Sequence, residues 1–497
     1  MVRARNPLRN WFAQNSNVLF PLLAFLVPVL VRAIPELLMG QFLVGFDSIG
    51  YYVPNTLVWL KQGVALSAFL SEAPLIYVIL TSIASTGASI VISLKVLSPL
   101  LLGFLGLALY GYALKALSWS RKKSLFVVLF GTLFFVALRV SWDMLRSELG
   151  LIFLFLALIL LQKKKLSTKD GVLLSMIMVL IVFTHQLVTV ILFAIVIATL
   201  LQIAFQKRKT DLLKLIGYSV PAAFLFSTVL YILYFGHSIP FLGFSDNFSV
   251  GFQALFGGSY SSLIVNTLGF LAFCYLPLLP LLVFSVRRFK GNIQLKAWII
   301  WTFIAILSVF VPGGFALGGV LPYRWILLLI YPLAFYAAEG FSAVKWRWYK
   351  IGVVFLLAIL SLSFLALPNS GALGYFDIYP SYVPKSMLQN TVQLSDCQDT
   401  ANALLWARNN MPNDASLLTH AAFYGWAVLT IKSDRLIFYG FKNPVQVAQQ
   451  QSNSSILYLI WWVNGSGWYG QPNLPQSFVE CYNSGNIAIY RYAESSS

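Results

Sequence analysis

The chain has 497 residues, of which 59% are apolar and only 10% are charged, and its mean hydropathy is +0.78. A soluble domain carries about a quarter charged residues, so most of this chain is expected to face lipid. The formal net charge of +18 does not indicate nucleic-acid binding, because the basic residues lie in short clusters between apolar runs.

About eleven apolar runs are long enough, or nearly so, to cross about 30 Å of hydrocarbon. The first follows three arginines but has no small-residue cleavage site, so we interpret it as a span and not as a signal peptide. The run 171–205 has basic clusters at both ends, which predicts two crossings with a turn near His185 and Gln186. The predicted spans are 17–33, 91–114, 124–140, 149–162, 171–186, 187–205, 215–235, 262–285, 297–312, 324–343 and 350–367.

The distribution of basic residues predicts the orientation in the membrane. With the N-terminus inside, the cytoplasmic segments hold 22 of the 34 Lys and Arg residues, and every cytoplasmic loop is basic. Because cytoplasmic loops of membrane proteins are enriched in Lys and Arg, this count predicts a C-terminus outside the cytoplasm. We expect a multi-pass protein of the cell membrane.

A long outer loop, residues 32–95, follows the first span and carries acidic residues. Glu36 lies near its start, and Gly45-Phe46-Asp47-Ser48-Ile49-Gly50-Tyr51-Tyr52 follows. The stretch 74–90 is apolar but interrupted by Ser, Thr and Gly, which predicts a helix lying at the membrane interface. From the residues alone, Asp47 is either a reactive carboxylate or the cap of a juxtamembrane helix.

Two further charged clusters fall on the predicted outer face. Arg139, Asp143, Arg146 and Glu148 lie between the third and fourth spans, and Arg324 enters a later span in Pro322-Tyr323-Arg324-Trp325. Charged groups at membrane depth usually face a cavity or a partner. Asp143 is therefore either a site residue or the ion-pair partner of a neighbouring arginine, and Arg324 is either a site residue or an interfacial anchor.

The polar segment 368–497 is predicted to be a mixed α/β domain outside the cytoplasm, following a transmembrane region over 1–367. Ala401–Asn409 is typical of a helix, and residues 486–492 alternate as a strand does. Cys397 and Cys481 predict a disulfide, with two free thiols as the alternative. Sequons begin at Asn247, Asn453 and Asn464.

With this topology, the motifs resemble those of C-type (GT-C) membrane glycosyltransferases, especially archaeal members related to the catalytic subunit of oligosaccharyltransferase. Gly-Phe-Asp-x-x-x-Tyr-Tyr at 45–52 is similar to the acidic motif of the family's first outer loop. Ser141-Trp142-Asp143 with Glu148 resembles its second acidic motif, and Arg324 its late-span arginine. Residues 405–415 resemble the stretch before the WWDYG signature, which this chain lacks apart from Tyr424-Gly425.

The resemblance implies a transferase that uses a polyprenyl-phosphate-linked (dolichyl-type) sugar donor at the outer face and a glycan, lipid or protein acceptor. Asp47 and Asp143 are the expected catalytic residues, and Arg324 and Arg139 the expected ligands of the donor phosphate. Mg²⁺ or Mn²⁺ held by Asp47 and Asp143 is an open alternative, as in some relatives. The expected accessory residues are Glu36, Glu148, Tyr51, Tyr52 and His185.

Three other functions compete with this interpretation. A transporter or flippase of lipid-linked sugars would usually show internal repeats and charges near mid-membrane. An oligosaccharyltransferase proper would need the missing Trp-Trp-Asp. A non-catalytic relative would only hold a partner through its C-terminal segment.

Overall fold

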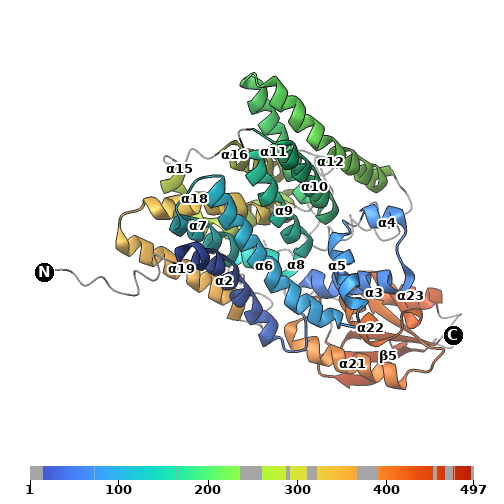
Figure 1. Ribbon diagram of the computed structural model, residues 1–497. Coiled ribbons are helices and arrows are strands. Elements are labelled where there is room, and N and C mark those ends of the chain that lie inside the picture. The colour runs from blue at the N-terminus through green and yellow to red at the C-terminus, as the bar shows by residue number, and fades with distance from the viewer. Residues whose placement is uncertain are drawn as a thin grey trace.

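The computed structural model describes residues 15–71, 73–163, 165–235, 260–286, 292–310, 322–366, 390–440, 442–451, 456–464, 474 and 476–493. Among these residues the chain is helical as far as Ala366, and a small sheet with its own helices follows from Asn390 onward (Figure 1). The predicted domain boundary at 367–368 lies outside the described residues, as do the sequons at Asn247 and Asn453. Asn464 lies in an exposed turn after a strand.

The first half of the helical region carries both predicted acidic motifs. Two of its segments, η1 (Ser48–Tyr52) and η2 (Leu129–Leu133), are single turns of π-helix, a rare form that is frequent at functional sites. In chain order the elements are α2 (Ser16–Leu38), η1 (Ser48–Tyr52), α3 (Val53–Gln62), α4 (Leu66–Ser71), α5 (Leu75–Ala84), α6 (Ile90–Lys115), α7 (Arg121–Val128), η2 (Leu129–Leu133), α8 (Phe135–Asp143) and α9 (Leu145–Leu161).

The second half adds a group of helices that project from the bundle in Figure 1, and the helix that carries Arg324. Its elements are α10 (Thr168–Thr184), α11 (Gln186–Phe205), α12 (Lys209–Phe235), α14 (Tyr260–Tyr275), η4 (Leu276–Leu278), α15 (Leu279–Val286), α16 (Ile293–Leu307), η5 (Ser308–Phe310), α17 (Pro322–Leu328), α18 (Ile330–Ala343) and α19 (Arg347–Ala366).

Helices occupy all eleven predicted runs, yet fewer satisfy the length and hydropathy expected of a span. Among the described residues six do so, and a seventh is added if Arg121–Leu133 and Phe135–Asp143, bent by 58°, form one span. The predicted break in 171–205 is present, because His185 has an extended backbone between α10 and α11. The chain is a multi-pass membrane protein, and its eleven crossings stay a prediction.

The long first loop is shorter than predicted. Helix α2 continues to Leu38 and α6 begins at Ile90, so Glu36 and Lys95 lie within helices. Ion pairs explain why these charges are tolerated there, since Glu36 contacts Arg32 at 2.9 Å and Lys95 at 3.2 Å. The predicted interfacial helix over 74–90 is also shorter, because it ends at Ala84.

The C-terminal region contains a five-stranded sheet with strand order β2-β1-β3-β5-β4. Strand β1 is parallel to β2 and β3, whereas β5 is antiparallel to β3 and β4. Every residue of β3 is buried, as expected for a strand covered on both faces. The elements are η8 (Leu394–Asp396), α21 (Cys397–Asn410), β1 (Ser416–His420), α22 (Ala421–Thr430), η9 (Ser433–Arg435), β2 (Leu436–Gly440), α23 (Pro444–Gln451), β3 (Leu457–Trp462), β4 (Phe478–Ser484) and β5 (Ile487–Tyr492).

The predicted disulfide is wrong for this structure, because Cys397 and Cys481 are both free thiols. Cys397 is buried at the start of α21, whereas Cys481 is exposed in the edge strand β4. The neighbouring Tyr482 stacks on Trp406 of α21 at 5.2 Å between ring centroids. Cys481 lies at an irregularity of the β4–β5 pairing, between Glu480 and Tyr482, and is exposed there.

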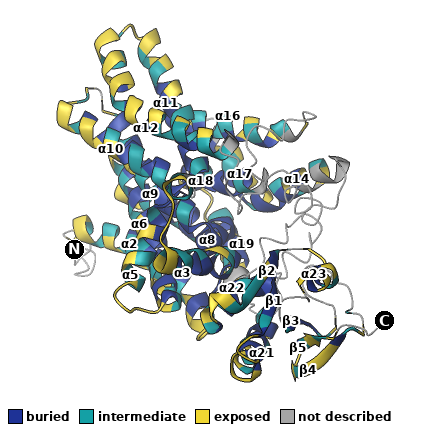
Figure 2. Cartoon of the chain, turned by 90° about the vertical axis from the view of Figure 1, so that its right-hand side faces the viewer, coloured by how far each residue is buried: buried dark blue, intermediate teal, exposed yellow. Residues whose placement is uncertain are grey.

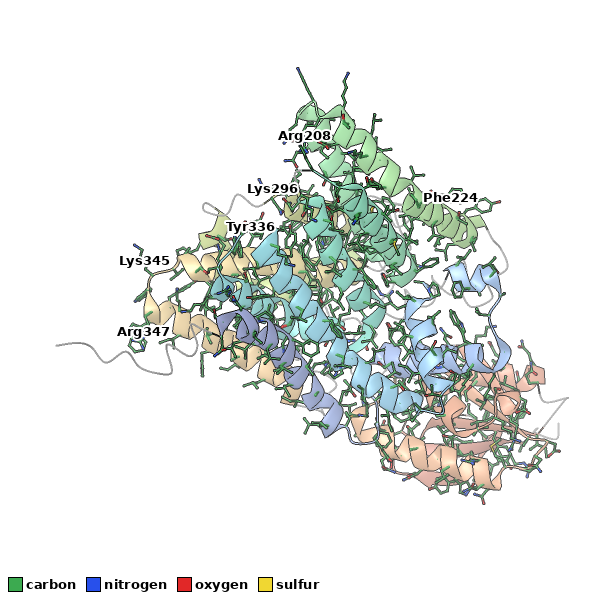
Figure 3. All side chains as sticks on the ribbon, viewed as in Figure 1. Arg208, Phe224, Lys296, Tyr336, Lys345 and Arg347 are labelled. Carbon is green, nitrogen blue, oxygen red and sulfur yellow. The ribbon has the colours of Figure 1, made fainter. Side chains whose placement is uncertain are left out.

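Burial is concentrated in the helices that carry the charged motifs. All nine residues of α8 are buried, whereas Figure 2 shows exposed residues on the projecting helices α10 to α12 and on the outer elements of the sheet region. Figure 3 labels four basic residues, Arg208, Lys296, Lys345 and Arg347, on the part of the helical region away from the sheet. This is the side that the charge count predicts to be cytoplasmic.

Candidate active site

The acidic loop of the first motif lies against the end of α8. Gly45 has φ +106°, and a Cβ atom built on it would lie 2.1 Å from the carbonyl oxygen of Trp142. Only glycine combines this backbone angle with such a close approach. Beyond it, the Asp47 amide donates to Asp143 Oδ1 at 3.3 Å and Ser48 Oγ donates to the Trp142 carbonyl at 3.4 Å. The Asp143 carboxylate therefore contacts the backbone of Asp47, the other predicted catalytic residue.

Tyr52 connects the same loop to the junction between α8 and α9. Its hydroxyl donates to the Asp143 carbonyl at 2.9 Å and accepts from the Arg146 amide at 3.4 Å. Its side chain is buried, whereas Tyr51 in the same π-helix is 41% exposed. Tyr52 is thus a structural link between the two acidic motifs.

Asp143 forms an ion pair with Arg139, one helical turn earlier on α8, and both side chains are almost fully buried. The i, i+4 spacing places the two groups on one face of the helix. This pairing is the alternative that the sequence left open for Asp143. It does not favour the predicted phosphate-binding role of Arg139, because the guanidinium already balances a carboxylate.

Asp47 lies at the start of the π-helix, but its side chain makes no capping hydrogen bond there. The guanidinium groups of Arg324, Arg146 and Arg139 all act on its carboxyl group electrostatically. Burial raises the pKa of the Asp47 carboxyl above its usual value, and these three arginines oppose the rise. Asp47 is therefore a carboxylate beside several cations and not a helix cap.

Arg146 is the residue of this site that the sequence did not select. It is the first-turn arginine of α9, and its guanidinium lies over the Tyr77 ring at 5.8 Å from the centroid. Both Arg146 and Arg324 also act electrostatically on His185, at the break between α10 and α11. The sequence spacing of Arg146 from Asp143 did not indicate this position, because it depends on a contact with Tyr77, which comes from a separate helix, α5.

The other two predicted acids belong to a different cluster. Glu36 is bound by Arg32 and Lys95, and the buried Glu148 has Arg32 as its electrostatic neighbour. Arg32 is fully buried and also donates to the Ser141 carbonyl at 3.3 Å, which ties α2 to α8. Glu36 and Glu148 therefore surround Arg32 and do not face Asp47.

The described residues around Asp47 do not suit a divalent cation. They contain no group of three or more His, Cys, Asp or Glu side chains arranged to hold a metal ion. The Asp143 oxygens already accept from the Asp47 amide and from Arg139, and the three arginines outnumber the two carboxylates. This excess of positive charge suits an anion.

Comparison with known proteins identifies the fold. No family model and no curated protein sequence matches the chain. The crystal structure of ArnT from Cupriavidus metallidurans bound to undecaprenyl phosphate superposes with a TM-score of 0.55 at 14% identity, covering 97% of this chain and 99% of ArnT. The apo structure of the same protein gives 0.56 at 12% identity, covering 96% and 98%.

A second transferase gives a similar match over part of its length. The cryo-EM structure of the arabinofuranosyltransferase AftD from Mycobacteria has a TM-score of 0.53 at 11% identity, covering 98% of this chain and 40% of AftD. The chain shares their fold. The likeness confirms the predicted fold, whereas the relation to archaeal members and to oligosaccharyltransferase stays a prediction. The loop after α2, the end of α8 and the start of α17 bring Asp47, Asp143 and Arg324 near one another.

Proposed function

We propose that the chain is a membrane glycosyltransferase that takes sugar from a polyprenyl-phosphate-linked donor. The observation that carries the proposal is the placement of the Asp47 carboxyl beside Asp143 and within the field of Arg146 and Arg324. A carboxylate next to an excess of guanidinium groups suits an acceptor hydroxyl and a donor phosphate together. The bound lipid phosphate of ArnT supports a donor of this class.

The proposed reaction is a displacement at the anomeric carbon. The Asp47 carboxylate takes the proton of the acceptor hydroxyl while the oxygen of that hydroxyl forms the new bond to the anomeric carbon. The bond from that carbon to the phosphate oxygen breaks, and the lipid phosphate leaves with the electron pair. Arg324 and Arg146 offset the charge that develops on this phosphate. Asp143, balanced by Arg139, fixes the Asp47 backbone.

Orientation follows from the same proposal. The transmembrane region over 1–367 would place the site at the outer face, beside an extracytoplasmic domain over 368–497. Basic residues on the side away from the sheet support this orientation (Figure 3). A glycan, lipid or protein acceptor would then reach Asp47 from outside the cell.

A transfer assay with the purified protein tests the proposed function. Polyprenyl-phosphate donors labelled in the sugar are incubated with the protein and with membrane extracts as acceptors. Label should move to the acceptor while polyprenyl phosphate is released. If the label stays on the lipid and only crosses the bilayer of proteoliposomes, the chain is a transporter.

Alanine at Arg324 or at Arg146 should weaken both donor binding and the chemical step. Each loses a cation that meets the leaving phosphate, so we expect a higher donor KM and a kcat lower by about 10²- to 10³-fold. Arg324→Lys should retain part of the activity, because it keeps the charge but loses the bidentate geometry. Steady-state kinetics with varied donor measure both constants.

Arg347→Ala is the matched control, since Arg347 lies on the side away from the sheet (Figure 3). It should leave both kinetic constants unchanged. Wild-type donor KM and kcat in Arg324→Ala and Arg146→Ala would remove these residues from the phosphate site.

A further inference from the structure

The sheet region contacts the acidic loop through a glycine. A Cβ atom built on Gly425 of α22 would lie only 1.7 Å from the Ile49 carbonyl oxygen of η1. Gly425 has no positive φ, so its backbone conformation does not require glycine. Glycine within a helix costs about 1 kcal/mol relative to alanine. The feature that requires glycine here is the close approach of α22 to η1.

Two hydrogen bonds strengthen the same contact. The buried Asn390 donates through Nδ2 to the Leu43 carbonyl at 2.9 Å, two residues before Gly45. Trp426 donates through Nε1 to Thr391 Oγ1 at 3.1 Å. The Thr391 methyl group lies against Gly50, 3.2 Å from the position of a built Cβ atom. The segment after residue 390 therefore holds the acidic loop on both sides of Asp47.

The apolar side chains around these contacts form a single core. Leu43, Ile49 and Tyr52 of the acidic loop belong to the same buried cluster as Phe423 and Trp426 of α22. The opposite face of the loop rests on α8 through Gly45 and Asp143. The loop is thus packed between a membrane helix and the sheet region.

We infer that α22 is a positioning element of the active site, and that Gly425 and Thr391 set the place of Asp47 through η1. This inference rests on the proposed function for its kinetic effect, although the contact itself does not. Arg324 comes from α17, outside η1, so displacement of η1 should move the base and leave this phosphate ligand in place. A misplaced base lowers kcat more than it raises the donor KM.

Gly425→Ala tests the inference. The added methyl group must push η1 away from α22, and we expect kcat to fall by about 10²-fold with a donor KM close to that of the wild type. Hydrogen exchange of the amides over 43–52 should become faster. Gly217→Ala is the matched control, because Gly217 lies within α12 with open space around it. It should change neither kcat nor the rate of hydrogen exchange over 43–52.

The outcomes separate the two proposals. Wild-type kcat and wild-type exchange over 43–52 in folded Gly425→Ala would overturn the positioning role. If Gly425→Ala does not fold, Thr391→Val removes the acceptor of the Trp426 bond and should lower kcat about 3- to 10-fold; an unchanged kcat there would also overturn it. Faster exchange in a protein whose wild type transfers no sugar would uphold the contact and reject the proposed function.

Discussion

Asp47→Asn should lower the rate of sugar transfer by about 10²- to 10⁴-fold. Asparagine keeps the size of the side chain and cannot accept a proton at neutral pH, while the backbone bond from residue 47 to Asp143 is retained. The protein should therefore fold normally and bind donor. Single-turnover transfer by purified variant and wild type measures the loss, and Asp434→Asn, at an exposed position in the sheet region, is the control. Full activity of Asp47→Asn would move the role of base to Asp143.

The pH dependence of transfer should report the same carboxyl group. Its raised pKa, caused by burial and opposed by Arg324, Arg146 and Arg139, means that it takes up a proton at a higher pH than a free aspartate. A base acts only when deprotonated, so kcat should fall as the pH is lowered through this pKa. Arg324→Gln removes one opposing cation and should move the midpoint upward. A midpoint that stays unchanged in Arg324→Gln would show that Arg324 does not act electrostatically on the carboxyl group that titrates.

Arg139→Ala should be strongly destabilising, by about 3–5 kcal/mol, because it leaves the buried carboxyl of Asp143 without its counter-charge. The helix that carries both residues is buried along its whole length, so water cannot replace the guanidinium. Unfolding in a mixed-detergent titration measures the change in free energy of unfolding.

Two further variants sharpen this expectation. Lys163→Ala removes the partner of Asp170 in a pair with side-chain exposures of 45% and 23%, and should lower the free energy of unfolding far less than Arg139→Ala. Arg139→Ala combined with Asp143→Asn should recover part of the loss, since the buried charge is gone. Equal effects of Arg139→Ala and Lys163→Ala would show that the buried pair does not balance charge in α8.

The sequence was informative wherever local pattern decides structure. The apolar runs coincide with helices among the described residues, and alternation located the strand over 487–492, because burial against lipid or a sheet needs these periods. The turn at His185 followed from the basic clusters on both sides of one long apolar run. Asp47, Asp143 and Arg324 were selected as candidates because charges are rare in such a chain.

Contacts between distant elements were not predictable from these patterns. The sequence could not show that Arg139 is paired with Asp143 and that Arg146 instead contacts Tyr77 of another helix. Nor could it show which face of β4 carries Cys481, since a strand's facing depends on its register in the sheet. The sequence did not indicate the close approach of Gly425 to η1, because the residue it contacts, Ile49, is 376 residues earlier in the chain.

The common core of the acidic loop and α22 limits how this protein can be taken apart. A sheet region that shares buried side chains with Leu43 and Ile49 is not an interchangeable module. Exchanging it between relatives in order to change the acceptor would leave apolar surface exposed on both parts unless the first outer loop were exchanged with it. The loop and the sheet region therefore have to be exchanged together, as one packing unit.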